Sequence, residues 1–175
     1  ASGNRIRIAS GPVTNMGEAA DVVIAFNEQV PYSRIDVGAL GPGTVLFIES
    51  MWATSPDETV RAAYAEAVAD FHDKGYRLIE VPMDAECRKV IEDPRRGKNI
   101  WSLGLLCWLY ERDLSIVDDL IERKLGKKGL AVVEANRSLL RAGYEWAAAN
   151  LDFRFRVPVQ ESAEARVVMN GNEAL

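Results

Sequence analysis

The sequence has few of the residues from which metal sites and acid–base pairs are usually built. It contains one histidine, His72, and two cysteines, Cys87 and Cys107. A structural zinc site and an iron–sulfur cluster each take four ligands, so this chain cannot supply either by itself. His72 lies late in a predicted helix beside Asp73, where it needs no catalytic role. We therefore expect no metal ligands and no acid–base catalyst here, and two reduced cysteines, as in a cytoplasm.

A surplus of positive charge is also lacking. The chain carries 21 lysines and arginines against 26 aspartates and glutamates, which gives a net charge of −5. Binding of nucleic acid calls for a basic surface, and the nearest basic cluster, Arg95, Arg96 and Lys98, is interpreted as a solvated loop. No apolar run has the length of a membrane span, and no signal peptide is recognised. We expect a cytoplasmic protein that has neither nucleic acid nor a membrane as its partner.

Neither of the glycine-rich nucleotide motifs occurs, since the chain has no G-x-G-x-x-G and no G-x-x-x-x-G-K-[ST]. Instead, short apolar runs alternate with amphipathic patterns. We expect strands at 21–27, 45–49, 76–81 and 153–157, and helices at 56–74, 85–91, 100–110, 114–125 and 130–149. This alternation favours an α/β fold, with a mainly parallel sheet flanked by helices and a C-terminal helical block. The first strand, glycine loop and helix that usually open such folds are missing.

Several residues at the ends of these elements are typical of helix caps. Ser55, Asp84 and Ser115 are expected to be N-caps, and Gly126 is expected to end a helix in the left-handed conformation. Asn27 follows the first predicted strand, at the edge where parallel sheets gather ligands. It is therefore either a ligand contact or a helix N-cap, and the cap is the simpler interpretation.

Five segments in succession resemble the gamma domain of the 2-oxoacid:ferredoxin oxidoreductases, in the version fused ahead of the alpha domain. They are GNRIRIAS, ADVVIAFN, GPGTVLFIES, KNIWSLGLL and VVEANRSLLRAGYEWA. The last ten residues, RVVMNGNEAL, resemble the opening of that alpha domain. The resemblance implies an N-terminally truncated gamma domain at 1–157, a linker at 158–165, and the first element of the pyrimidine-binding alpha domain at 166–175. We expect the chain to be a fragment of a larger subunit.

The resemblance also implies an activity. Such enzymes oxidatively decarboxylate a 2-oxo acid, here with 2-oxoglutarate favoured, on thiamine pyrophosphate with Mg²⁺. They transfer the acyl group to coenzyme A and pass electrons through [4Fe-4S] clusters to ferredoxin, and some members run the reaction in reverse. Thiamine and cluster lie on a beta subunit, while the gamma domain is implicated in admitting coenzyme A. The implied partners are the beta subunit, the remainder of the alpha subunit, and ferredoxin, so this chain would not be active alone.

Four residues are implied to bind the cofactor by their place in the family's motifs. Arg7 falls on the arginine of G-G-x-[ST]-x-x-x-[VIL]-R-[IF]-S, with Ser2 on its hydroxyl position and Asn4 on a polar position. Asn27 matches the asparagine that often ends the A-D-x-[VL]-[VIL]-A-x-N strand. The chain departs from the pattern at Ala9, where serine is usual, and it lacks the family's opening glycine-rich loop.

Two further positions match the N-x-x-x-L-G helix of this family, Asn99 and Gly104. The glycine of that motif lets two helices pack closely. An alternative from another class stays open: the chain could be a non-catalytic α/β scaffold or interaction module whose helical block binds a partner. Pull-down discriminates between the two, because the enzyme requires a beta partner that carries thiamine and a cluster.

Overall fold

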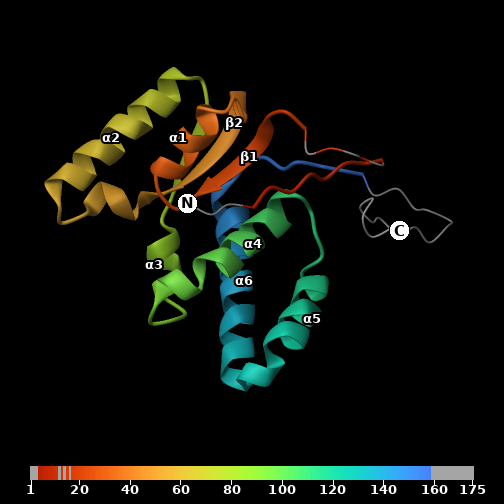
Figure 1. Cartoon of the computed structure of the whole chain (residues 1–175). Helices are drawn as coiled ribbons and strands as arrows, with labels where there is room; N and C mark the ends of the chain where they lie inside the picture. The colour runs from red at the N-terminus through yellow and green to blue at the C-terminus, as the bar shows by residue number, and fades with distance from the viewer. Residues whose placement is uncertain (1–3, 12, 14, 16, 159–175) are drawn as a thin grey trace, which may run out of the picture.

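The computed structural model describes residues 4–11, 13, 15 and 17–158 (Figure 1). Ser2, all of the expected linker except Pro158, and the expected alpha-domain element at 166–175 lie outside the described residues. The description below concerns the described part of the chain.

The centre of the fold is a parallel sheet of three strands in the order β1-β2-β3. Its strands are β1 (Ala20–Ala25), β2 (Leu40–Glu49) and β3 (Arg77–Val81). Parallel neighbours need a crossover connection. Here α1 (Gln29–Ile35) joins β1 to β2, while the short 3-10 helix η1 (Ser50–Thr54) and α2 (Glu58–Asp73) join β2 to β3. The expected α/β class with a parallel sheet is thus confirmed.

Strand β2 is buried on both faces because helices cover both sides of the sheet. Leu46 and Ile48 point into a core formed with Tyr64 and Phe71 of α2. Val45 and Phe47, which alternate with them, point to the opposite side, where they meet the long C-terminal helices. Figure 1 shows α1 and α2 on one side of the sheet and α4 and α6 on the other. A strand enclosed in this way has to be a nearly continuous apolar run.

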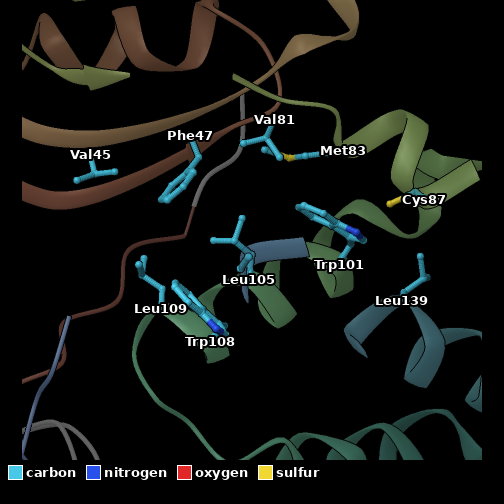
Figure 2. Packing of buried hydrophobic residues seen from close by; sticks show 11 residues of the cluster. Val45, Phe47, Val81, Met83, Cys87, Trp101, Leu105, Trp108, Leu109 and Leu139 are labelled. Carbon is cyan, nitrogen blue, oxygen red and sulfur yellow. The ribbon is translucent and has the colours of Figure 1, made fainter. Parts of the chain in front are cut away.

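Four helices follow the sheet. They are α3 (Met83–Arg88), α4 (Lys98–Leu109), α5 (Leu114–Leu125) and α6 (Leu130–Asn150), with 3-10 turns η2 (Pro94–Arg96) and η3 (Gly126–Lys128). Figure 2 shows Trp101, Leu105, Trp108 and Leu109 of α4 lying below Phe47 of the sheet. Within the described residues, no helix combines the length and apolar character needed to cross a membrane.

Helices α4 and α6 touch backbone to backbone at two glycines. A Cβ atom added to Gly104 would lie 2.0 Å from the carbonyl oxygen of Leu140, and one added to Gly143 would lie 1.9 Å from that of Trp101. Such distances leave no room for any side chain. The expectation that Gly104 allows two helices to pack closely is therefore confirmed, and its partner is α6.

Two of the predicted N-caps are wrong. The side chain of Asp57, not Ser55, accepts the hydrogen bond at the start of α2, from the backbone N–H of Thr59 at 2.8 Å. At α5, Asp113 accepts from the N–H of Ser115, also at 2.8 Å. In both cases the aspartate stands immediately before the first helical residue, where its oxygen reaches a free N–H of the first turn and its negative charge is favourable.

Two predictions on the C-terminal side are also wrong. Gly126 has φ of −54° and continues into η3, and a positive φ comes only at Gly129, with φ of 102° and ψ of 154°. Residues 153–157 do not form an edge strand. They run extended across the α4 side of the sheet, and Phe155 N–H donates to the carbonyl of Leu109 at 2.8 Å. Aromatic packing of Phe155 on Tyr110 and ion pairs from Arg154 and Arg156 to Glu111, not a ladder of backbone hydrogen bonds, hold this segment.

Candidate functional site

An open groove of about 1020 Å³ lies at the carboxyl edge of the sheet. Each strand contributes the segment that follows it: residues 26–27 after β1, 51–52 after β2, and positions 84 and 88 of α3 after β3. Residues 92–95 and 98–99, before and at the start of α4, line the far side together with Asn4. In open parallel sheets this edge is where ligands bind, because the loops that follow the strands converge there.

Trp52 is fixed in this groove by a hydrogen bond between two neighbouring loops. Its indole Nε1–H donates to the backbone carbonyl of Phe26 at 2.8 Å. The ring is half-buried, and it packs against the core on the α2 side of the sheet. The bond thus ties the segment after β2 to the segment after β1.

Four charged side chains form a network beneath and along the groove. Lys98 Nζ lies 2.7 Å from Oε2 of Glu49 and 3.2 Å from Oδ1 of Asp84. Arg88 Nε donates to the other oxygen of Asp84 at 2.7 Å. Glu49 is 0% exposed and Lys98 only 8% exposed, so the pair at the centre is withdrawn from water.

The buried carboxylate of Glu49 is fully satisfied by its surroundings. Besides Lys98, it accepts from the backbone N–H of Met51 at 3.1 Å and from that of Asp84 at 2.9 Å. A buried charge is tolerated only when it is paired and hydrogen-bonded in this way. The consequence is geometric: one carboxylate holds together the end of β2, the start of α3 and the start of α4.

Asp84 is ionised within this network. Burial alone would raise the pKa of its carboxyl, but the hydrogen bonds from Arg88 and Lys98 outweigh burial, and the pKa lies below its ordinary value. With Glu49 and Asp84 negative and Lys98 and Arg88 positive, the four charges balance. The network is therefore neutral overall, and it fixes the elements that line the groove relative to one another.

Two interpretations made from the sequence are corrected here. Lys98 is not part of a solvated loop, because it begins α4 and is buried between two carboxylates, whereas Arg95 and Arg96 are exposed as expected. Asp84 is not a helix cap, because α3 begins before it and its side chain is turned to Lys98 and Arg88. In both cases the pairing of opposite charges explains where the side chain lies.

The structure separates the four residues that the family motifs implied. Asn4 and Asn27 both line the groove. Asn27 Oδ1 also accepts from the N–H of Val30 at 3.2 Å, so it caps the first turn of α1 while facing the groove. Arg7 is not among the lining residues; its guanidinium hydrogen-bonds to the side chain and the carbonyl of Asn15 in an exposed loop. Ser2 lies outside the described residues.

The sequence patterns missed Trp52 and the pair Glu49 and Lys98. One signal was present: Glu49 ends the apolar run Val45 to Ile48, and a charge at the carboxyl end of a buried strand is typical of a site. Nothing in the sequence indicates that its partner lies 49 residues further on.

The groove combines apolar, cationic, amide and carboxylate side chains. Trp52, Phe26 and Met51 supply apolar surface, and Arg88 and Asn99 supply hydrogen-bond donors. The part of the chain that the structure describes has no group of three or more histidine, cysteine, aspartate or glutamate side chains placed to hold a metal ion. Both cysteines of the chain are buried, and burial raises the pKa of the Cys87 thiol to about 12. Two such thiols do not fit an iron–sulfur cluster, which takes four thiolates.

Comparison with known proteins gives two findings. The family model described as pyruvate ferredoxin/flavodoxin oxidoreductase matches residues 2–146. The subunit KorA of 2-oxoglutarate oxidoreductase from Mycobacterium tuberculosis strain H37Rv is 26% identical over 149 residues, which are 81% of this chain and 22% of that protein. The chain therefore spans about a fifth of the length of the curated relative that it matches.

Proposed function

The chain belongs to the pyruvate ferredoxin/flavodoxin oxidoreductase family, and on that premise we propose that residues 1–157 are the gamma domain of a larger 2-oxoacid:ferredoxin oxidoreductase subunit. Residues 158–165 would be a linker, and residues 166–175 would open the alpha domain. The proposal is supported by the similarity to KorA, whose much greater length leaves room for further domains. The α/β fold with a groove at the carboxyl edge of its sheet is suited to binding a substrate-sized molecule.

The complete enzyme would convert a 2-oxo acid, 2-oxoglutarate by preference, to its acyl-CoA and reduce ferredoxin, or carry out the reverse carboxylation. This chain would help to bind coenzyme A and to assemble the complex. The groove is the observation that carries this role, because it combines apolar surface with guanidinium and amide donors and contains no acid–base pair with a histidine. Binding of a substrate requires apolar surface and hydrogen-bond donors, but it requires no acid–base pair.

Thiamine pyrophosphate, Mg²⁺ and the [4Fe-4S] cluster would be held by a beta subunit. The donor set of this chain supports that division, because it has one histidine and two buried cysteines. The beta subunit, the remainder of the alpha subunit and ferredoxin are the proposed partners. Free, buried cysteines are also what is expected of a protein that functions in the reducing cytoplasm.

The test is activity of the native complex. The full-length gene product, purified from its own host, is assayed for coenzyme A-dependent reduction of a viologen dye with 2-oxoglutarate, pyruvate and indolepyruvate in parallel. Activity with 2-oxoglutarate supports the proposal in full, and activity with another acid keeps the enzyme class and replaces the substrate. A colourless preparation without partner subunits and without activity would favour the scaffold.

The proposed contribution of Arg7 has its own test in that enzyme. If the Arg7 guanidinium contacts a phosphate of coenzyme A, Arg7→Ala raises the KM for coenzyme A and leaves the KM for the 2-oxo acid unchanged. Arg5→Ala is the matched control, since Arg5 is exposed two residues away and bonds to the carbonyls of Gly17 and Glu18. Equal kinetics for both variants would make Arg7 a structural residue of its loop.

A further inference from the structure

The hairpin formed by α5 and the adjoining part of α6 extends away from the sheet (Figure 1). It carries a basic cluster at its tip and an apolar stripe along the outer side of α5. From these two features we infer that the hairpin is a docking surface for an acidic face of another protein subunit. The inference rests on the proposed function in taking the beta subunit as that partner, and it goes further by assigning the contact to one surface of this chain.

The basic cluster consists of four exposed cations in and beside η3. They are Arg123, Lys124, Lys127 and Lys128. Among the described residues, none of the four takes part in an ion pair. The carboxylates closest to them on the two helices pair with Arg137 instead, and these belong to Asp118, Glu122 and Glu134, at 4.0, 3.1 and 2.8 Å. The exposed carboxylate of Asp119 balances only one of the four cations, so the surface of the tip is positive.

The fold itself gains nothing from two of these cations. Lys127 and Lys128 stand just before the N-terminus of α6, which is the positive end of the helix dipole, and a cation there is unfavourable. The helix has no side-chain N-cap and no acidic residue in its first turn that would offset them. Side chains that work against local stability are expected where function requires them. An anionic partner at the tip would explain both lysines.

The apolar stripe adjoins this cluster on α5. Ile116 is 61% exposed, and Leu120, one turn further along the same face, is 40% exposed. Neither is needed for the packing of α5 on the rest of the protein. That packing uses another face of the helix, through Leu114, Val117, Ile121 and Leu125. Exposed aliphatic side chains next to cations indicate a protein interface whose partner carries acidic residues.

Two other occupants match the hairpin less well. A second copy of this chain would bring like charges together, because a two-fold contact places the same patch on both sides. A membrane surface favours a helix with a broad free apolar face. The outer side of α5 instead exposes only Ile116 and Leu120 within the described residues, because the broader apolar face of the helix is used inside the protein. An acidic protein surface matches both the charge and the narrow stripe.

The first experiment identifies the occupant directly. The photo-reactive residue p-benzoylphenylalanine replaces Leu120 in the full-length subunit, and the complete enzyme is irradiated in the presence of ferredoxin. We expect a cross-link to an acidic segment of the beta subunit, located by mass spectrometry. The control places the same residue at Val37, which is 70% exposed after α1 on the opposite side of the sheet. Equal yields at both positions, or cross-links only to ferredoxin, to a second copy or to no protein, would overturn the inference.

The second experiment measures the Kd between the full-length subunit and the beta subunit by analytical ultracentrifugation. Lys127→Glu/Lys128→Glu should raise the Kd roughly tenfold at low salt, and the difference should shrink at high salt because salt screens the attraction. The same variant should raise the urea midpoint of the subunit, since it replaces cations by anions before α6. Arg34→Glu is the control, because Arg34 is an exposed cation of α1, and it should leave the Kd unchanged.

The two proposals fail in different ways. An unchanged Kd in Lys127→Glu/Lys128→Glu would overturn the docking surface even if the assembled enzyme is fully active. A purified complex whose acidic partner cross-links at position 120 but carries neither thiamine nor a cluster would keep the docking surface and remove the proposed enzyme. Ile116→Ser/Leu120→Ser adds a test of the stripe, because its effect on the Kd should persist at high salt.

Discussion

Replacing Lys98 by methionine tests the buried charge network beneath the groove. Methionine keeps the length of the apolar stem but removes the ammonium group that lies 2.7 Å from Glu49 and 3.2 Å from Asp84. Glu49 is 0% exposed and would be left as a buried carboxylate with only backbone donors. Removing one partner of a buried ion pair typically costs about 3–5 kcal/mol of stability. We expect Lys98→Met to lose an amount in that range.

The free energy of unfolding is measured by urea denaturation of Lys98→Met, Glu49→Gln and the double variant. Lys89→Met is the matched control, because Lys89 pairs with Glu86 at 2.7 Å on an exposed surface, where such pairs contribute about 0–1 kcal/mol. The double variant should be more stable than Lys98→Met, since neutralising Glu49 removes the unpaired buried charge. A loss below about 1 kcal/mol for Lys98→Met, equal to the control, would refute the idea that this network holds the loops together.

Three further outcomes are expected. Gly104→Ala should lower the free energy of unfolding by about 3 kcal/mol in urea denaturation, because the added Cβ would lie 2.0 Å from the carbonyl oxygen of Leu140. Gly126→Ala should leave it unchanged, and an equal loss for the two variants would contradict the close contact of α4 with α6. Asp84 has a lowered pKa, so its stabilisation is complete above about pH 4 and is lost as the pH falls through the lowered value. The stability difference between the wild type and Asp84→Asn should therefore shrink below about pH 4 in acid titration, and a constant difference would argue against the ion pair. Burial raises the pKa of the Cys87 thiol to about 12, so maleimide labelling of this thiol at pH 8 should be slow in the folded protein and complete in denaturant. Rapid labelling of Cys87 in the folded protein would show that the thiol is accessible.

The strands of this sheet are largely predictable from sequence because parallel strands enclosed by helices are continuous apolar runs. β1 and β3 begin within one residue of the expected positions, and α5 has the expected bounds. β2 begins five residues earlier than predicted. Its start contains two glycines and a proline and lies outside the expected strand, but Thr44 Oγ1 donates to the carbonyl of Ala20 at 2.8 Å and accepts from the N–H of Gly41 at 3.1 Å. This side chain bridges an irregular register between β1 and β2.

The groove was predictable only in part. The carboxyl edge and Asn27 follow from the order of strands, since ligands gather where the loops converge. The pairing of Glu49 with Lys98 does not, because the charges are distant in sequence and Lys98 stands in a basic run that resembles a solvated surface. Trp52 was missed for a related reason: only the bond to Phe26 shows that its ring is held at the groove.

Hydrogen–deuterium exchange of the complete enzyme with and without coenzyme A tests the central claim most directly, namely that the groove of this domain receives that substrate. The account predicts slower exchange on binding in residues 50–54 and 92–99, which line or flank the groove. Helix α5, which packs on α6 and lines no part of the groove, should be unaffected. Protection confined to other domains, with no change in residues 50–54 and 92–99 at saturating coenzyme A, would contradict it.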